Sequence, residues 1–486
     1  MKTPAPWTRT LLYAATLAFV PGAACALEDA EAVLRRASAA MGGGDLKTIR
    51  FAGSGTGATF GQAFKPGTAW PKLNYSNFAR VADYPNAALR EDFSRSRGEP
   101  TGGGAVPLSG EQKLTTYVHG TYAWNVAGPA PAPAGVALDS RIHDLWTTPH
   151  GVVLAALRNK AAVTWRVQGG KEVAAVSFTE PGRFSAIALI DENYLVKRVE
   201  ARVPHPVLGD TAVVTTYSDY QDYGGVKFPR RIQQSAGGFP VLDITVSEVQ
   251  ANPPAGITVP DNVLKAAERV ATEKAAEGVW FLAGGSHNSV AIEMQDHIIL
   301  VESPLYDGRA APVLEAAGKL VPGKPVRYVV NSHDHFDHAG GLRTAVASGA
   351  TLVVHGDAKP YFERVLANPN RIHPDLLAAS GKKARVLGVN GKRVFSDGTR
   401  TVEVHAFKDS VHSDAFLLVY LPKEKLLVEA DAFTPPPPNT PAPTPANANN
   451  VNLADNIARL NLPVERILPL HGRIVPVGEL YRVVGR

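Results

Sequence analysis

Residues 328–342 read YVVNSHDHFDHAGGL, an apolar run followed by a turn that is dense in metal-capable side chains. The run is typical of a buried strand, and the turn holds four candidate ligands within six residues: His333, His335, Asp337 and His338. In an extended turn His333 and His335 point the same way, because side chains alternate with a period of two. Both can therefore bind one ion, while Asp337 and His338 reach a second position close by. The pattern predicts a metal site at the end of a strand.

Three later segments each offer one more metal-capable side chain beside an apolar strand. His412 precedes the apolar run in FKDSVHSDAFLLVYL (407–421), Asp431 ends LLVEAD (426–431), and His471 lies in ILPLHG (467–472). The four motifs, in this order, resemble the signature of the metallo-β-lactamase superfamily. The resemblance covers about residues 278–486 and implies an α/β fold, the αββα sandwich of hydrolases that bind one or two metals.

The resemblance implies a role for each of these residues. His333, His335 and His412 would hold one ion, Asp337, His338 and His471 would hold the second, and Asp431 would span both. Five histidines and two carboxylates suit Zn²⁺, so two zinc ions per chain are expected. Two cations that share a water lower its pKa toward neutrality and create a bound hydroxide nucleophile. Asp337 would be catalytic, orienting the hydroxide and passing its proton to the leaving group.

Two departures from the superfamily pattern refine this expectation. The β-lactam hydrolases of this fold carry Cys or Ser where this chain has Asp431, whereas a carboxylate resembles the thioester, lactone and phosphodiester hydrolases. An ester or lactone is therefore the leading expected substrate, ahead of an amide, a β-lactam or a phosphodiester. The second departure is Val301-Glu302-Ser303-Pro304, where the superfamily commonly has an Asp-Thr/Ser-Gly turn. Either Glu302 holds the metal loop in its place, or the support differs.

The remaining histidines are expected to be structural. His405 competes with His412 for the third-ligand role, but it lies inside an alternating strand and not at its end. His287, in GGSHNS (284–289), is either near the rim of the pocket or structural. His119, His143, His150 and His205 show no spacing that suggests a site. The chain also has no Gly-x-Ser-x-Gly segment for a serine nucleophile.

The N-terminal segment has the features of an export signal. Residues 1–26 combine Lys2 and Arg9, an apolar run at 11–20 and the small-x-small sequence Ala24-Cys25-Ala26. Cleavage after Ala26 is expected, which predicts a periplasmic or secreted protein. The alternative is a lipoprotein acylated at Cys25. In both cases the only cysteine is removed or acylated, so no free thiol is expected.

Composition narrows the partners. The 486 residues are 45% hydrophobic and 20% charged, which excludes wholesale disorder and a coiled coil. The net charge is +5, and it falls to +3 without the two leader cations, too little to argue for nucleic acid. No later stretch is apolar for long enough to span a bilayer. We therefore expect a small-molecule substrate.

Two domains are expected. Residues 27–252 begin with a helix at 28–41 and continue as short alternating runs typical of an antiparallel β meander. Within them, YSDYQDYGGVKFPRRI (217–232) resembles a phrase of periplasmic lipoprotein-carrier-like domains, which are curved half-barrels. Residues 253–277 are predicted to be a linker and a helix (262–277), and 278–486 the metallo-β-lactamase-like domain. The proline-rich stretch 434–450 is predicted to be extended, before a helix at 452–460.

Two other functions stay open. Relatives of this fold bind iron for oxidoreductase chemistry, but diiron versions typically need Glu where His335 stands, and no flavin-binding segment follows. The other alternative is a binding protein in which the N-terminal β domain captures an apolar ligand and the metal domain is secondary.

Overall fold

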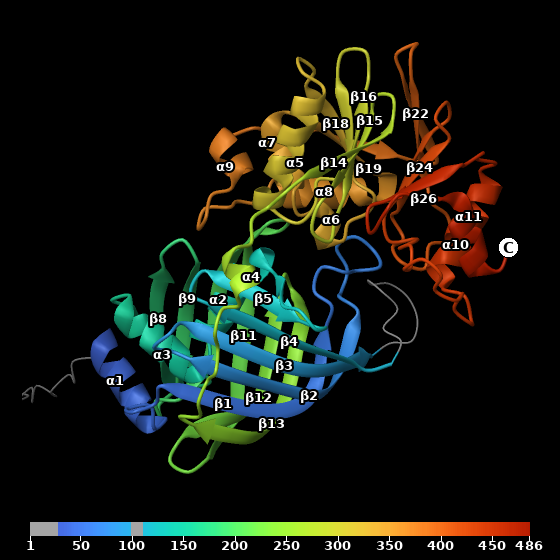
Figure 1. Cartoon of the computed structure of the whole chain (residues 1–486). Helices are drawn as coiled ribbons and strands as arrows, with labels where there is room; N and C mark the ends of the chain where they lie inside the picture. Colours follow the sequence, from blue (N-terminus) through green and yellow to red (C-terminus); the bar gives the residue numbers. More distant parts are fainter. Residues whose placement is uncertain (1–27, 99–109) are drawn as a thin grey trace, which may run out of the picture.

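The computed structural model describes residues 28–98 and 110–486 (Figure 1). The export signal predicted at residues 1–26 lies outside these ranges and stays a prediction. Within the described ranges, no helix has the length and apolar character that crossing a membrane requires.

The N-terminal half is built on one 13-stranded sheet in which every pair of neighbours is antiparallel, as the alternating pattern predicts. Consecutive strands are neighbours in the sheet except β6 and β7, which lie at its two ends, and β1 pairs with β13 in the middle. The strands are β1 (Thr48–Ala58), β2 (Lys72–Asp83), β3 (Ala88–Arg97), β4 (Gln112–His119), β5 (Tyr122–Val126), β6 (Ala132–Pro133), β7 (Ala162–Gln168), β8 (Lys171–Glu180), β9 (Phe184–Ile190), β10 (Val196–His205), β11 (Gly209–Asp222), β12 (Lys227–Ala236) and β13 (Phe239–Ala251). The sheet curls around its helices (Figure 1).

Within residues 28–98 and 110–252, three α-helices pack on this sheet, and two of them were not predicted. Helix α1 (Ala30–Ala40) matches the predicted helix, but α2 (Leu138–Trp146) and α3 (Pro149–Arg158) interrupt a region expected to be β throughout. Buried Ile142, Leu145 and Trp146 lie at helical spacing on α2. Thr148 caps α3 by accepting a hydrogen bond from the Gly151 N–H, and Pro149 starts it. These signs of helix were present in the sequence, but strand-like runs surround them on both sides.

The helix predicted at residues 262–277 is wrong. Only α4 (Asp261–Leu264) is helical, and β14 (Ala271–Ala276) forms the edge of a sheet. Ala, Glu and Lys favour helix, but pairing with the neighbouring strand outweighs that preference, with Thr272 opposite Leu282.

The C-terminal half contains two sheets with helices outside them. One sheet runs in the order β14, β15 (Val279–Ala283), β16 (Ser289–Glu293), β17 (Ile298–Val301), β18 (Val326–Val330), β19 (Thr351–His355) and β20 (Val386–Val389). The other contains β21 (Lys392–Ser396), β22 (Thr401–Ala406), β23 (Leu417–Leu421), β24 (Leu426–Glu429), β25 (Arg466–Pro469) and β26 (Val475–Pro476). The helices are α5 (Asp307–Leu320), α6 (Phe336–Ala339), α7 (Leu342–Ser348), α8 (Lys359–Leu366), α9 (Leu376–Ser380), α10 (Ala448–Arg459) and α11 (Val477–Val484). Helix α10 begins inside the stretch predicted to be extended.

Strand β17 shows how the layers form. Ile298 and Leu300 pack toward a core shared with α5, α7 and α8, whereas Ile299 and Val301 pack into the core between the two sheets. This alternation follows from the two-residue period of a strand and explains why the run is apolar on both faces. The result is the αββα sandwich that the sequence predicts.

The loop between β1 and β2 reaches from the N-terminal half to the C-terminal half. The carbonyl of Gly61 accepts a hydrogen bond from the Phe336 N–H at 3.1 Å, and the carbonyl of Phe64 accepts one from the Asp414 N–H at 2.8 Å. This loop touches the segment that carries the predicted metal ligands.

Candidate metal centre

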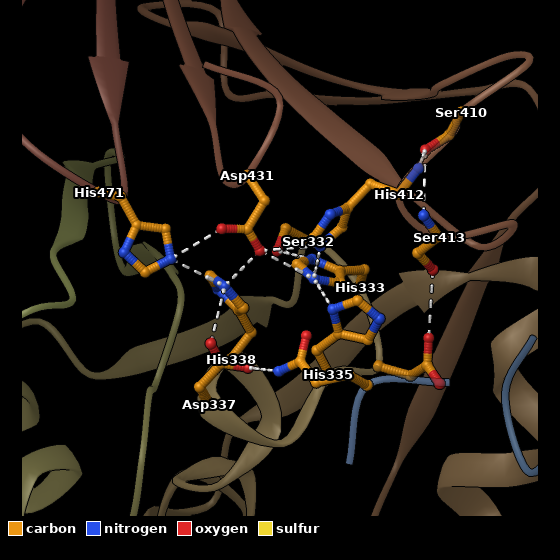
Figure 2. Close-up of polar contacts among 12 residues, drawn as sticks. Ser332, His333, His335, Asp337, His338, Ser410, His412, Ser413, Asp431 and His471 are labelled. Carbon is orange, nitrogen blue, oxygen red and sulfur yellow. Dashed lines mark hydrogen bonds and ion pairs between the residues drawn. The ribbon is translucent and has the colours of Figure 1, made fainter. Parts of the chain in front are cut away.

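The predicted ligands come from loops at the carboxyl ends of strands. The segment after β18 carries His333 and His335 and continues into α6 with Asp337 and His338. His412 lies between β22 and β23, Asp431 follows β24 and His471 follows β25. Strands β24 and β25 are parallel, so their carboxyl ends meet at the same edge. All seven predicted side chains are brought together there (Figure 2).

Asp431 lies at the centre of this group. Its Oδ2 is 3.2 Å from His333 Nε2, 3.0 Å from His412 Nε2 and 2.9 Å from His338 Nε2. Its Oδ1 is 2.9 Å from His471 Nε2. One carboxylate therefore contacts a histidine from each of the two expected ligand sets.

The donor atoms fit metal ions. They form two groups: His333, His335, His412 and Asp431, and His287, Asp337, His338 and His471. Within a group, the donor atoms lie within 4.8 Å of one another. Zinc–nitrogen bonds of about 2.0–2.1 Å in a tetrahedral site place neighbouring donors roughly 3.3 Å apart. The distance from His412 Nε2 to His333 Nε2 and that from His471 Nε2 to His338 Nε2 are both 3.2 Å.

The protonation states of His333 and Asp431 favour metal binding. Burial lowers the pKa of His333 to about 3, so its ring is neutral near pH 7. Burial alone would raise the pKa of Asp431, but His338 and His412 hold it well below its usual range. Metal binding requires a neutral imidazole and an ionised carboxylate. His333 and Asp431 have the required form without further proton loss. Burial alone would lower the pKa of His338, but Asp431, Asp337 and Glu302 hold it well above its usual range, so His338 must lose a proton to bind an ion.

The segment 332–338, here called the metal loop, is held by a buried carboxylate. Glu302 Oε1 accepts the Ser332 N–H at 2.6 Å, and Glu302 Oε2 lies 3.1 Å from His338 Nδ1. The Glu302 side chain is fully buried. Of the two alternatives left by the sequence, the structure places Glu302 in the supporting position.

Two contacts from the N-terminal half were not predicted. Gln62 Nε2 donates to Asp337 Oδ1 at 2.8 Å, and the Ala63 carbonyl lies 3.1 Å from His335 Nε2. Both residues belong to the β1–β2 loop. No local motif could have indicated them, because the partners lie 275 and 272 positions away along the chain.

His287 is closer to the centre than the sequence suggested. Its Nε2 is 3.2 Å from Asp337 Oδ2, and Ser286 Oγ lies 2.7 Å from its Nδ1. The only signal was its place in a Gly-rich turn before a strand. His405 instead pairs with Glu403 at 2.8 Å, away from the two groups, as expected.

Comparisons with known proteins agree with this geometry. The family model of the metallo-beta-lactamase superfamily matches residues 282–471. A curated relative, the 2,4-dinitroanisole O-demethylase subunit alpha of Nocardioides sp. (strain JS1661), is 27% identical over 171 residues, which are 34% of this chain and 47% of that protein. The chain thus spans about half the length of this relative.

Solved metallo-beta-lactamases are also similar to part of the chain. The DIM-1 enzyme exposed to ceftazidime is 15% identical, over 46% of this chain and 97% of its own, with a TM-score of 0.34. The Pontibacter korlensis enzyme is 18% identical, over 45% and 98%, with a TM-score of 0.33. FIM-1 from Pseudomonas aeruginosa, in a mono-zinc form, is 18% identical, over 44% and 93%, with a TM-score of 0.33. The match to the metallo-beta-lactamase superfamily model, over residues 282–471, covers all the predicted metal ligands.

Proposed function

We propose that this protein is an exported dinuclear zinc hydrolase that acts on an ester or a lactone. The observation that supports it most directly is the position of Asp431, whose two oxygens contact histidines of both donor groups at 2.9–3.2 Å. A carboxylate in this position suits a pair of ions. The family match over residues 282–471 agrees with metal-dependent hydrolysis.

Bound zinc would supply an activated water and polarise the oxygen of the scissile group. The protein's own residues set the direction of approach. His333, His335 and His338 are buried, whereas the Asp337 side chain is 30% exposed. Asp337 is thus the acidic group at the opening, and Gln62 and His287 hold its two oxygens in place. It can accept a proton from the attacking water and return it to the leaving group.

The substrate class within this proposal follows from Asp431, as argued from the sequence. The curated relative is named for the O-demethylation of 2,4-dinitroanisole, so that compound belongs in any substrate panel.

The first experiment is metal content by elemental mass spectrometry on wild type, His335→Ala and His405→Ala, together with rates on an ester, a lactone, a cephalosporin, a phosphodiester and 2,4-dinitroanisole. His405 is a matched control, because it is also a buried histidine but lies outside both donor groups. We expect about two zinc ions per chain, with metal and activity reduced only in His335→Ala. Iron in place of zinc, or equal metal in all three proteins, would contradict the proposal.

A further inference from the structure

A cleft between the two halves of the molecule leads to the metal centre. Its volume is about 560 Å³, and Gln62 and Asp337 line one end of it. The β1–β2 loop and the end of β10 line it on one side, with Phe60, Pro204 and His205. The loops after β17 and α8 line the other side, with Tyr306 and His373 among them. Whatever fills this cleft touches the most exposed of the predicted ligands.

A second cavity, inside the curled N-terminal sheet, adjoins the cleft. Its volume is about 220 Å³. Four residues line both spaces: Phe60, Ser140, Pro204 and His205. The inner cavity is largely apolar, and its apolar lining includes Tyr75, Phe78, Val203, Val213, Ala236, Val241 and Leu242. Its polar lining includes Arg80, Glu91, Asp144 and Gln234. A wholly apolar cavity of about 150 Å³ is enough for a benzene ring, so the apolar part of this larger cavity has room for a group of that size.

The charges around these spaces do not favour an anion. Among the described residues, no Lys or Arg lines the cleft, whereas Asp139, Asp307, Asp337 and Asp375 do. In the described part of the chain, Arg80 is the one Lys or Arg that lines the inner cavity, and it is paired with Glu91 at 2.7 Å and with Asp144 at 3.5 Å. Burial lowers the pKa of His205 to about 3, so this histidine is neutral at pH 7. Away from the metal end of the cleft, an anionic group would meet carboxylates without an unpaired Lys or Arg nearby.

We propose that the inner cavity and the cleft bind the uncharged, apolar part of the substrate. The preferred substrates are then neutral esters or lactones with a ring-sized apolar group, and anionic analogues are rejected. This inference rests on the proposed hydrolase function for the reaction, but the binding of the apolar group can be measured separately.

The binding test uses two dyes that differ by one sulfonate, N-phenyl-1-naphthylamine and 8-anilino-1-naphthalenesulfonate. Val213 lines the inner cavity, whereas its neighbour Val214 lines a hollow of about 530 Å³ elsewhere on the sheet. Val213→Phe therefore fills the cavity, and Val214→Phe is the matched control. We expect the neutral dye to bind about tenfold more tightly than the sulfonate, and Val213→Phe alone to weaken it at least fivefold. Val241→Phe fills the same cavity from another strand in case Val213→Phe does not fold.

The substrate test compares methyl acetate, methyl phenylacetate and methyl 4-carboxyphenylacetate, with acid release followed in a pH-stat. We expect kcat/KM to be highest for methyl phenylacetate, and Val213→Phe to remove this preference through KM while Val214→Phe keeps it. Equal dye binding by both variants, or a preference for the carboxylate ester, would overturn the inference. Selective loss of dye binding in Val213→Phe, with no hydrolysis of any ester by the zinc-loaded wild type, would support the apolar site and overturn the hydrolase proposal.

Discussion

His338 is held by carboxylates at both ring nitrogens. Its Nδ1 lies 3.1 Å from Glu302 Oε2, and its Nε2 lies 2.9 Å from Asp431 Oδ2. When the Nδ1–H is donated to Glu302, the Nε2 lone pair points toward the metal centre. A buried acceptor behind a histidine fixes the tautomer and orientation that a metal needs. Glu302 thus acts on the centre through His338 and through the Ser332 N–H.

Changing Glu302→Gln should weaken zinc binding by about 10–100-fold, the usual effect of losing a partner behind a metal ligand. The amide keeps the shape of the side chain but loses the charge and one acceptor. The measurement is zinc affinity by chelator competition. The matched control is Glu403→Gln, because Glu403 contacts His405 at 2.8 Å outside the centre. Equal zinc affinity in the two variants would contradict this role for Glu302.

Gln62 should affect the rate more than metal binding. It donates to Asp337 Oδ1 at 2.8 Å, so its loss lets the carboxylate rotate without removing a ligand. We expect Gln62→Ala to lower kcat about tenfold, which corresponds to one hydrogen bond to a charged group, with zinc content and KM little changed. The control is Gln233→Ala, which removes a 2.9 Å contact with Asp243 on the N-terminal sheet. A loss of zinc in Gln62→Ala would instead indicate a structural role.

The candidate centre could be predicted from sequence where short-range spacing carried the signal. His333, His335, Asp337 and His338 lie within six consecutive positions, and each later ligand adjoins an apolar strand. Gln62 and Ala63 could not be predicted, because they contact the centre only after two distant parts of the chain have packed. A sequence motif reflects the spacing of residues close together in the chain. A contact between two distant segments produces no such pattern in either of them.

Among the elements, the β1–β2 loop depends on the close approach of Gly61 to the ring of Phe336. Its φ is +85°, and a Cβ there would lie 2.3 Å from a ring atom of Phe336. Phe60 and Trp70, at either end of the loop, pack edge-on against the same ring. The loop can therefore contact the metal segment only with glycine at this position.

Gly61→Ala should destabilise the β1–β2 loop by more than the strain of a positive φ alone would. The control is Gly238→Ala, where φ is +93° but no atom lies within 4 Å of the added Cβ. Each variant has a backbone cost of about 1–2 kcal/mol, and only Gly61→Ala adds a clash. We expect a lower unfolding temperature and lower kcat for Gly61→Ala than for the control. Thermal unfolding and steady-state kinetics check this, and equal effects would show that the contact is unimportant.

The secondary structure was predictable where one period dominated. Strands β5 and β7 lie in the region where short alternating runs predict an antiparallel meander. The pattern was misleading at 271–276, where residues that favour helix form an edge strand because a partner is available. At α2 and α3, short amphipathic segments between many strands were assigned to the sheet. In each case, packing against residues distant in the sequence determined the secondary structure.

Considered as a whole, the molecule has its two halves joined at more than the metal loop. The Asp210 N–H donates to the Pro369 carbonyl at 2.8 Å, and Asp210 Oδ2 accepts the Arg371 N–H at 2.8 Å. The Asn368 side chain donates to the Leu208 carbonyl at 2.9 Å. His205 lies between these contacts and the metal loop, against Phe60 and Phe336. The junction is thus continuous from the β10–β11 turn to the β1–β2 loop.

His205 makes this junction sensitive to acid. Its Nδ1 accepts the N–H groups of Val207 and Leu208 at 3.1 and 3.2 Å, which requires a neutral ring, and burial lowers its pKa to about 3. In the unfolded chain the pKa is about 6.5, so the unfolded state takes up the proton first as the pH falls. The contribution of His205 to stability is therefore complete above about pH 6.5 and declines between about pH 6.5 and 3.

We expect the difference in free energy of unfolding between wild type and His205→Gln to shrink from pH 7.5 to pH 5, as measured by urea denaturation. The control is His373→Gln, because His373 lines the same cleft but its side chain is 63% exposed. A His205→Gln difference that stays constant with pH would contradict the argument.

Metal removal should loosen the junction as well as the centre. The β1–β2 loop contacts His335 and Asp337, and bound ions would hold both side chains in the positions that the loop requires. Because a ligand stabilises the state that binds it, zinc should stabilise the packed arrangement of both halves. We expect one calorimetric unfolding transition for the zinc-loaded protein, and two after chelation, the first at a lower temperature. Asp210→Ala, which weakens the junction far from the ligands, should widen the separation in the chelated protein. A chelator that lowers a single transition without splitting it would show that the halves unfold together whether or not the centre is filled.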